Sequence, residues 1–297
     1  MKMDNKLVIV CLLLFTATCN AGVFTPTVYV YSGDMPGFGE GIVEILNGSI
    51  EGVEFVAVND PTLLSSLIPM PDTACAILAV MKGKEVETLI TPLLTYFEGG
   101  GALIGFQGCM SLNTAGDLAT DIFPIFGNAT GSFTLKEGVP INEYVRDVSI
   151  SEFANLPESF NLLGQFFAYS VNSTKGKIDP MPDSGVKRVL YRDKKTEAPL
   201  IVAYESEEGS RSISLTGFFV RSTETASNYY GKLLVDPLFA DLMIDAVTWT
   251  MDGATRSSTY ESTYEDLIQD ERERAQELID KAERNRSDAQ NRKVLFL

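Results

Sequence analysis

Cys109 is the residue whose type and position most directly suggest chemistry. It closes the loop at residues 105–109 (GFQGC), which follows the apolar run at residues 102–106. Such a run is typical of a strand buried on both faces of a parallel sheet, and ligands bind beyond the carboxyl ends of those strands. We therefore expect a site in this loop. A reactive thiolate would need a helix start or a cation beside it, and a buried structural thiol is the simpler interpretation.

Histidine, the commonest general base, is absent from the whole chain. Its absence excludes imidazole catalysis and removes a ligand of typical zinc sites. The sequence also contains no Gly-x-Ser-x-Gly motif of the kind that presents a serine nucleophile. We therefore predict no metal and no cofactor, and two hypotheses stay open. One is a non-catalytic binding module, and the other is a hydrolase that uses Cys109 or a pair of carboxylates.

A second glycine-rich segment, at residues 32–41 (SGDMPGFGEG), lies between a strand pattern and a helical pattern. Such loops can bind phosphate, but the Gly-x-Gly-x-x-Gly spacing is missing, and Asp34 and Glu40 stand where an anion would sit. Nucleotide binding is therefore disfavoured. Asp179 and Asp183 likewise lack the spacing of a calcium loop, and a solvated turn is the simpler interpretation.

These loops must be positioned by an alternation of strands and helices in the first half of the chain. β-Branched and aromatic residues predict strands, and apolar residues at helical spacing predict helices. The expected strands are residues 27–31, 53–58, 74–80 and 102–106, and the expected helices are residues 42–46, 61–67 and 84–98. Pro92 implies a kink or a second helix that starts after Thr91, and the glycines at 99–101 supply a helix stop. This alternation is the signature of a parallel sheet flanked by helices.

The second half of the chain reads as richer in β-structure. Residues 110–125 mix helix formers with apolar residues, and residues 128–138 suggest a loop or hairpin. Further strands are expected at residues 148–153, 161–171, 186–191, 200–204 and 212–215, followed by an amphipathic helix at residues 237–251. The predicted fold class is therefore α/β: a flavodoxin-like parallel sheet flanked by helices, with additional β-strands in the second half and a C-terminal helical tail.

Two sequence blocks carry a resemblance to a known family. The first is the segment at residues 100–109 (GGALIGFQGC), and the second is Leu215-Thr216-Gly217. Together they resemble class I glutamine amidotransferase-like domains, especially the subgroup of biotin-protein ligase amino-terminal domains and ThuA-like proteins. The resemblance covers about residues 28–252, and only these two blocks within it are specific.

The resemblance implies a catalytic cysteine, a histidine and a glutamate, and this chain departs from all three. Gln107 occupies the nucleophile position, and Cys109 falls two residues late, where the family has a glycine. Phe219 replaces the histidine and Arg221 the glutamate. Glutamine hydrolysis needs the thiolate, its base and the orienting carboxylate together. The resemblance therefore implies an inactive remnant site lined by Gln107, Gly108, Cys109, Asp34, Phe219 and Arg221.

Length and charge restrict the partners. With 297 residues and 45% hydrophobic content, the chain can bury a full core. Its formal charge of −16 argues against a nucleic-acid partner, because the phosphate backbone would repel it. We expect an unidentified small ligand or a protein partner instead.

The first 21 residues read as a secretory signal segment. Two lysines precede an apolar run at residues 7–17, which is too short to span a bilayer, and small residues at positions 19 and 21 form a cleavage site. Residues 16–18 do not form a lipobox, so export is favoured over a lipoprotein anchored through Cys19. Cys75 and Cys109 then remain, at opposite ends of neighbouring expected strands, and no disulfide is expected between them. The candidate glycosylation sequons of an exported chain are Asn47, Asn128, Asn172 and Asn285.

The chain ends in a charged segment that differs from the rest. A Ser/Thr-rich linker leads to a capping box at Ser262 and Glu265, and a thin alanine-rich seam at heptad spacing follows. A solvated single helix is the simpler interpretation, and self-association through this helix is the alternative. The predicted division is a signal peptide at residues 1–21, an amidotransferase-like domain at 22–252, a linker at 253–263 and a charged helical tail at 264–297.

Overall fold

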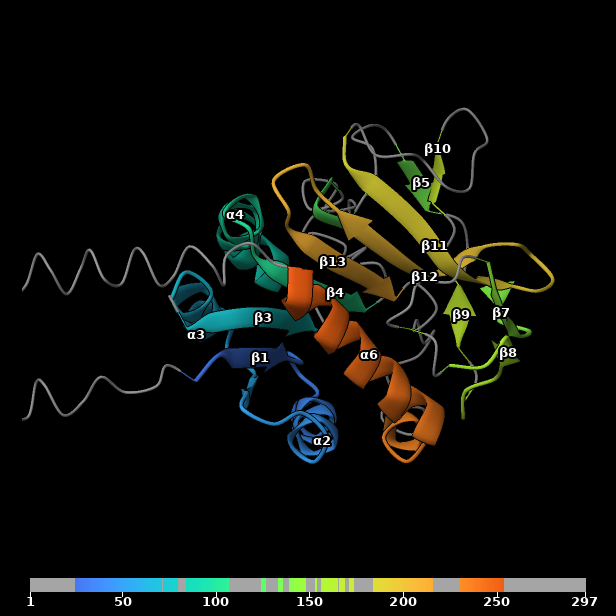
Figure 1. Ribbon diagram of the computed structural model, residues 1–297, viewed down its shortest axis with the longest axis horizontal. Coiled ribbons are helices and arrows are strands. Elements are labelled where there is room, and N and C mark those ends of the chain that lie inside the picture. Colours follow the sequence, from blue (N-terminus) through green and yellow to red (C-terminus); the bar gives the residue numbers. More distant parts are fainter. Residues whose placement is uncertain are drawn as a thin grey trace, which may run out of the picture.

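The computed structural model describes residues 25–70, 72–79, 84–106, 124–126, 133–135, 139–147, 153, 156–164, 166–168, 171–173, 184–215 and 230–253. A nine-stranded sheet in the order β2-β1-β3-β4-β13-β12-β11-β7-β8 runs through these residues (Figure 1). The expected signal segment, linker and charged tail lie outside the described residues.

The first five strands of this order run parallel to one another. They are β2 (Glu54–Val58), β1 (Thr27–Tyr31), β3 (Thr73–Leu78), β4 (Ala102–Phe106) and β13 (Arg211–Leu215). The order 2-1-3-4 followed by one more parallel strand is consistent with a flavodoxin-like sheet. The predicted mixed α/β class is therefore confirmed.

The remaining four strands continue the sheet with antiparallel pairing. They are β12 (Pro199–Glu205), β11 (Val186–Asp193), β7 (Tyr144–Arg146) and β8 (Ser159–Phe160). Two small antiparallel pairs lie outside the large sheet: β10 (Val171–Ser173) with β5 (Phe133–Leu135), and β6 (Val139–Pro140) with β9 (Phe167–Ala168). A short 3₁₀ helix, η3 (Pro124–Phe126), packs near β12 and β13.

Helices cover both faces of the parallel half. α2 (Pro36–Asn47) and α6 (Pro237–Gly253) share one face, and α3 (Pro61–Leu67) and α4 (Lys84–Glu98) share the other. The strands serve both faces by alternation: in β1, Val28 and Val30 join the α2/α6 cluster, whereas Tyr29 and Tyr31 join the α3/α4 cluster. The sheet is therefore buried on both sides, as its unbroken apolar runs predict.

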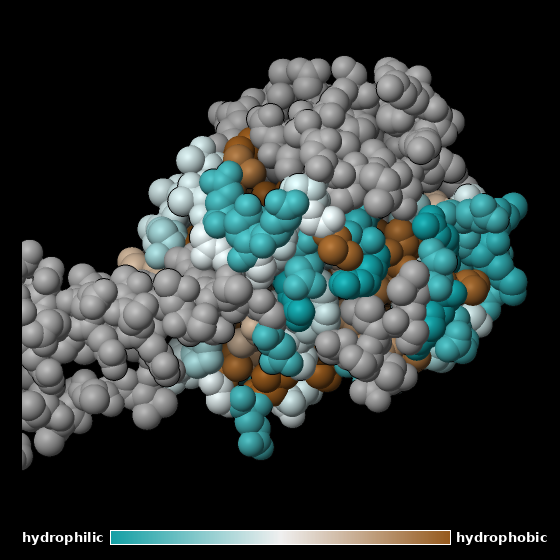
Figure 2. All heavy atoms as spheres, turned by 45° about the horizontal axis from the view of Figure 1, so that its top comes forward, coloured by the Kyte–Doolittle hydropathy of each residue, from teal (hydrophilic) through white to brown (hydrophobic). Residues whose placement is uncertain are grey.

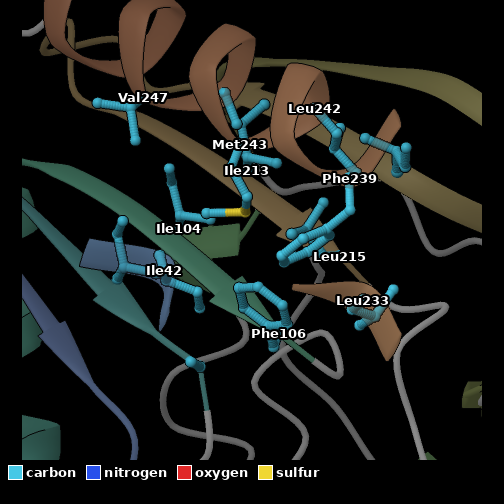
Figure 3. Packing of buried hydrophobic residues seen from close by; sticks show 14 of the residues in the cluster. Ile42, Ile104, Phe106, Ile213, Leu215, Leu233, Phe239, Leu242, Met243 and Val247 are labelled. Carbon is cyan, nitrogen blue, oxygen red and sulfur yellow. The ribbon is translucent and has the colours of Figure 1, made fainter. Parts of the chain in front are cut away.

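α6 supplies much of the first core. Figure 3 shows Phe239, Leu242, Met243 and Val247 of α6 above Ile104, Phe106, Ile213 and Leu215 of β4 and β13, with Ile42 of α2 beside them. All of these side chains are buried. On the face drawn in Figure 2, hydrophilic and apolar residues both reach the surface. None of the described helices is long and apolar enough to cross a membrane.

Most element predictions for the first half are confirmed to within two residues. β1, β4, α3 and α4 have the expected bounds, and β2 and β3 differ by one or two residues. Pro92 lies inside a single α4, so a second helix starting after Thr91 was wrong. The glycine stop is confirmed, because Gly100 has φ 87° and the backbone N–H of Gly101 donates to the carbonyl of Tyr96 at 3.0 Å.

The glycine-rich segment at residues 32–41 was expected to be a loop, and this was wrong over most of its length. α2 begins at Pro36, six residues before the expected helix at residue 42. Proline at the first helical position needs no hydrogen-bond partner for its nitrogen. The glycines serve close packing: a Cβ on Gly39 would lie 2.5 Å from Ser32 Oγ, and one on Gly41 would lie 2.4 Å from Leu234.

Two expected strands of the second half have other outcomes. Residues 148–152 of the expected strand at 148–153 lie outside the described part, so that strand stays a prediction, although Phe153 itself is in helical conformation and a strand, β7, lies just before the segment. The expected strand at residues 161–171 is instead interrupted, because residues 161–164 form no strand. The backbone N–H of Leu163 donates to Asp236 Oδ2 at 2.6 Å, so a side chain takes the hydrogen bond that a neighbouring strand would have taken. The expected strands at residues 186–191, 200–204 and 212–215 and the helix at 237–251 are confirmed.

Candidate functional site

The candidate site lies at the carboxyl edge of the parallel strands. The segments that leave this edge begin with Ser32 after β1, Asn59 after β2 and Ala79 after β3. Phe106 and Leu215, the last residues of β4 and β13, are register partners on adjacent strands. The segments that begin at residues 107 and 216 therefore leave from neighbouring strand ends. The sheet topology therefore places the ends of β4 and β13, from which the two sequence blocks of the family resemblance continue, at the same edge of the sheet.

Gln107, Gly108, Cys109, Phe219 and Arg221 lie outside the described residues, so the expected lining of the site stays a prediction. Asp34 is described and is exposed at this edge, two residues after the buried Ser32. It is placed where a ligand beyond the strand ends would meet it.

Ser32 and Asn59 form a polar pair that the sequence analysis did not single out. The fully buried Ser32 donates its hydroxyl hydrogen to Asn59 Oδ1 at 3.0 Å, and its backbone N–H donates to the carbonyl of Val58 at 3.4 Å. Asn59 is exposed, and its side-chain carbonyl oxygen accepts this hydrogen bond, so its NH₂ group is the part of the side chain left to donate. The signal that could have found this pair is position, since both residues directly follow strands that were predicted correctly.

The loop that carries Asp34 is fixed by its backbone. Gly33 has φ 50°, a left-handed conformation that favours glycine, and the carbonyl of Ser32 accepts from the N–H of Met35 at 2.9 Å. Close packing of Gly39 of α2 against Ser32 holds the loop from behind. After the neighbouring strand β2, Asp60 caps α3 by accepting a hydrogen bond from the backbone N–H of Thr62 at 2.8 Å. The edge is therefore preorganised by backbone and cap contacts.

Aromatic side chains form the floor below this edge. Phe38 of α2 stacks on Tyr230 with ring centroids 4.5 Å apart and meets Phe106 of β4 edge to face at 5.8 Å. Phe239 of α6 completes the group, 6.2 Å from Phe106 (Figure 3). All four rings are at least nine-tenths buried. They support the edge as packing residues and are not open to a ligand.

The remaining site predictions have mixed outcomes. Cys75 is a buried free thiol, and because Cys109 lies outside the described residues, the absence of a disulfide between them stays a prediction. Burial raises the pKa of the Cys75 thiol to about 12, although a contact with the Thr250 hydroxyl at 3.8 Å partly opposes this shift. Within the described ranges, no group of three or more histidine, cysteine or carboxylate side chains could hold a metal ion.

The structure describes only two of the four candidate glycosylation asparagines. Asn47 is exposed at the last residue of α2, where a glycan would meet no obstacle from the core. Asn172 lies in β10, and Asn128 and Asn285 lie outside the described residues. Glycosylation stays a prediction at all four.

No protein-family model and no curated protein sequence matches this chain. Among solved structures it is similar to a ThuA-like protein from Bacteroides uniformis, with a TM-score of 0.50 and 13% sequence identity over 75% of this chain and 90% of that one. At this identity the similarity shows a shared fold and not a shared activity. A cytoplasmic protein from Salmonella typhimurium (TM-score 0.48, 6% identity, covering 75% and 98%) and PurLQS from Thermotoga maritima (0.41, 12%, 76% and 99%) are less similar, and neither bears on function.

Proposed function

We propose that this protein is an exported, non-catalytic amidotransferase-like domain that acts as a ligand- or protein-binding module. The observation that carries the proposal is the absence of histidine from the entire chain. Amide hydrolysis on this scaffold requires a base that activates the thiol and protonates the leaving amine, and imidazole fills that role. A chain without histidine cannot supply it.

The resemblance supports the same conclusion. In that comparison the nucleophile position holds Gln107, an amide with no nucleophilic proton to lose, and Phe219 stands where the base would be. The polar groups at the strand edge fit recognition better than turnover: Ser32 is committed to Asn59, while the Asn59 amide and the Asp34 carboxylate are exposed. Polar groups at such an edge can fix the orientation of a bound ligand.

Turnover assays test the proposal directly. Residues 22–297 are incubated with L-glutamine and with p-nitrophenyl acetate, and released ammonia and nitrophenol are measured. We expect no release above buffer. Turnover that disappears in a Cys109→Ser variant would establish the displaced-nucleophile hydrolase, and turnover that survives this change but not the replacement of a carboxylate would establish the carboxylate pair.

Thiol labelling supplies an independent test of the same point. Under native conditions at pH 7, iodoacetamide is not expected to label either cysteine rapidly, whereas both react after unfolding in urea. Cys75 is the internal control, because burial raises its pKa to about 12 and leaves almost no thiolate. Fast, selective labelling of Cys109 in the native protein would show an activated thiol and contradict the proposal.

A further inference from the structure

Ser214 in β13 carries a buried hydroxyl group that the fold does not use. Ser214 is 2% exposed, and its Oγ has no hydrogen-bond partner among the described residues. The serine two positions earlier shows the ordinary arrangement, because the buried Ser212 donates its hydroxyl hydrogen to the carbonyl of Ile125 in η3 at 2.6 Å. Alternate residues of a strand point to the same side of a sheet, so Ser214 points to the side on which η3 and the α3/α4 cluster lie.

A glycine lies beside this hydroxyl in the sheet. Gly105 of β4 is the register partner of Ser214, and the pairing of β4 with β13 is regular through this position. The φ angle of Gly105 is outside the left-handed region, so its backbone does not require a glycine. A glycine inside a regular strand often marks a place where a ligand or another backbone segment comes close to the sheet. The unpaired hydroxyl and the missing side chain therefore coincide at one register position.

This position adjoins the candidate site. Gly105 and Ser214 each precede the last residue of their strand, so they lie about 3 Å below the carboxyl edge. The last residues, Phe106 and Leu215, point to the opposite side and pack below α6 (Figure 3). A molecule that enters past the ends of β4 and β13 on the η3 side would meet Gly105 and Ser214 first.

A hydroxyl that loses water on folding and gains no partner costs free energy, and alanine at the same position would avoid this cost. A partner that folding itself does not supply would explain why the hydroxyl is left unpaired. We infer that Gly105 and Ser214 form the inner end of the ligand site, where the Ser214 hydroxyl hydrogen-bonds to a polar group of the bound molecule. This assignment rests on the proposed function, because it requires that the strand edge binds a ligand.

The residues that flank this position restrict the chemistry of the ligand. In the register, Leu78 of β3 lies beside Gly105 and Val202 of β12 lies beside Ser214, and both are at least nine-tenths buried. A charged group would lose its hydration there without meeting an opposite charge at either flanking position. The serine hydroxyl can donate or accept a hydrogen bond. The group that it binds is therefore a neutral alcohol or carbonyl next to an apolar part of the ligand.

Alanine substitutions separate an unused hydroxyl from a structural one. Ser214→Ala removes an unpaired hydroxyl and is expected to raise the Tm of residues 22–297 by about 2–4 °C. Ser212→Ala is the matched control on the same strand and the same side of the sheet. It deprives the carbonyl of Ile125 of its donor and is expected to lower the Tm by a similar amount. A lower Tm in both variants would show that the Ser214 hydroxyl has a structural partner and would overturn the inference.

A thiol probe tests access to the same position. Ser214→Cys and Ser212→Cys are each made with Cys109→Ser, and both proteins keep the buried Cys75 as the background. The reagent is methyl methanethiosulfonate, a small neutral molecule that transfers its methylthio group to a thiolate and releases methanesulfinate. Mass spectrometry follows the reaction of the native protein, and each rate is divided by the rate in urea. We expect Ser214→Cys to react at least about tenfold faster than Ser212→Cys, and at least about tenfold faster with this reagent than with its anionic 2-sulfonatoethyl analogue.

Equal rates for the two cysteine variants, or reaction of Ser214→Cys only after unfolding, would overturn the inference and assign the space beside Gly105 to the chain itself. Equal rates with the neutral and anionic reagents would overturn the assignment of a neutral ligand. Failure of the proposed function would be seen separately, as turnover of glutamine or p-nitrophenyl acetate by the protein that retains Cys109. An unreactive Ser214→Cys without such turnover would remove the inner site and leave the non-catalytic binding module in place.

Discussion

The parallel and antiparallel halves of the sheet are stabilised in different ways. The parallel half is held by apolar burial between helices and strands that alternate along the chain, as in the cluster of α6 against β4 and β13. The antiparallel half also buries apolar side chains such as Tyr144, Phe160 and Tyr191, and polar side chains that reach distant backbone groups add to its stability. Asp193 in β11 accepts hydrogen bonds from the backbone N–H groups of Asn142 and Glu143, at 2.7 and 3.4 Å, about fifty residues away.

Arg146 serves the same purpose in β7, the strand that pairs with the end of β11 that carries Asp193. Its guanidinium Nη2 donates to the carbonyls of Phe153 and Leu156, and its Cζ lies 5.4 Å from the ring centroid of Tyr191. Apolar burial tolerates small shifts in position, whereas these contacts require particular residues at particular distances. The parallel half should therefore respond to changes of volume, and the antiparallel half to changes of single polar atoms.

The largest effect is expected from Phe239→Ala. Phe239 is fully buried between Phe38 and Phe106, so its removal leaves a cavity in the main core. We expect a loss of about 3–5 kcal/mol in the free energy of unfolding, measured by urea denaturation. The control Val235→Ala removes an exposed side chain and should cost less than about 0.5 kcal/mol. Similar losses in the two variants would refute the cavity explanation.

Arg146→Met should come next. Methionine keeps most of the apolar stem but loses the donors to Phe153 and Leu156, so we expect a loss of about 2 kcal/mol. Hydrogen exchange should accelerate in β7 and β8 and stay slow in β1 and β4. Arg188→Met, which removes a half-exposed partner of Glu205, is the comparison and should cost less. If hydrogen exchange accelerated equally in all strands of the sheet, the contacts of Arg146 would not be specific to the stability of the antiparallel half.

Asp193 makes the stability of the antiparallel half depend on pH. Burial alone would raise its pKa, but hydrogen bonds from Thr196 and from the backbone N–H groups of Asn142 and Glu143 hold the pKa below its ordinary value. Its stabilising contribution is therefore complete above an ordinary aspartate pKa of about 4 and is lost as pH falls through the lower, folded value. Urea unfolding between about pH 7 and pH 2 should show this loss in wild type and not in Asp193→Asn, which is less stable at neutral pH. Parallel pH profiles for the two proteins would contradict the assignment.

The smallest effect is expected at an exposed contact of the same half. Lys194 Nζ lies 2.6 Å from Glu143 Oε2, and this hydrogen bond, together with one from Ser159, lowers the pKa of the Glu143 carboxyl. Solvent screens the pair, and ordering two long side chains offsets the attraction. Glu143→Gln should leave the urea midpoint unchanged within measurement error. A clear shift would place this ion pair among the contacts that hold the antiparallel half.

The sequence alone determined the parallel half. Strand and helix signals there are local: a β-branched and aromatic run marks β1, an apolar run marks β4, Asp60 and Pro61 start α3, and the glycines at 99–101 end α4. Because each β-α-β unit packs against its sequence neighbours, local periodicity and tertiary structure agree. The position of the candidate site, at the carboxyl edge of these strands, followed from the same signals.

Only the tertiary structure decided the remainder. The buried Asp236 interrupts the expected strand at residues 161–171 by accepting from the N–H of Leu163, and no local pattern around Leu163 indicates a partner more than seventy residues away. The Ser32–Asn59 contact likewise joins two strand ends that are adjacent only because β1 and β2 pair. The early start of α2 depends on glycines that fit against Ser32 and Leu234. The periodicity of apolar residues in the sequence indicates which face of a helix or strand is buried. The three contacts described here depend instead on which distant residue lies against that face, and the distant residue is brought there only when the chain has folded.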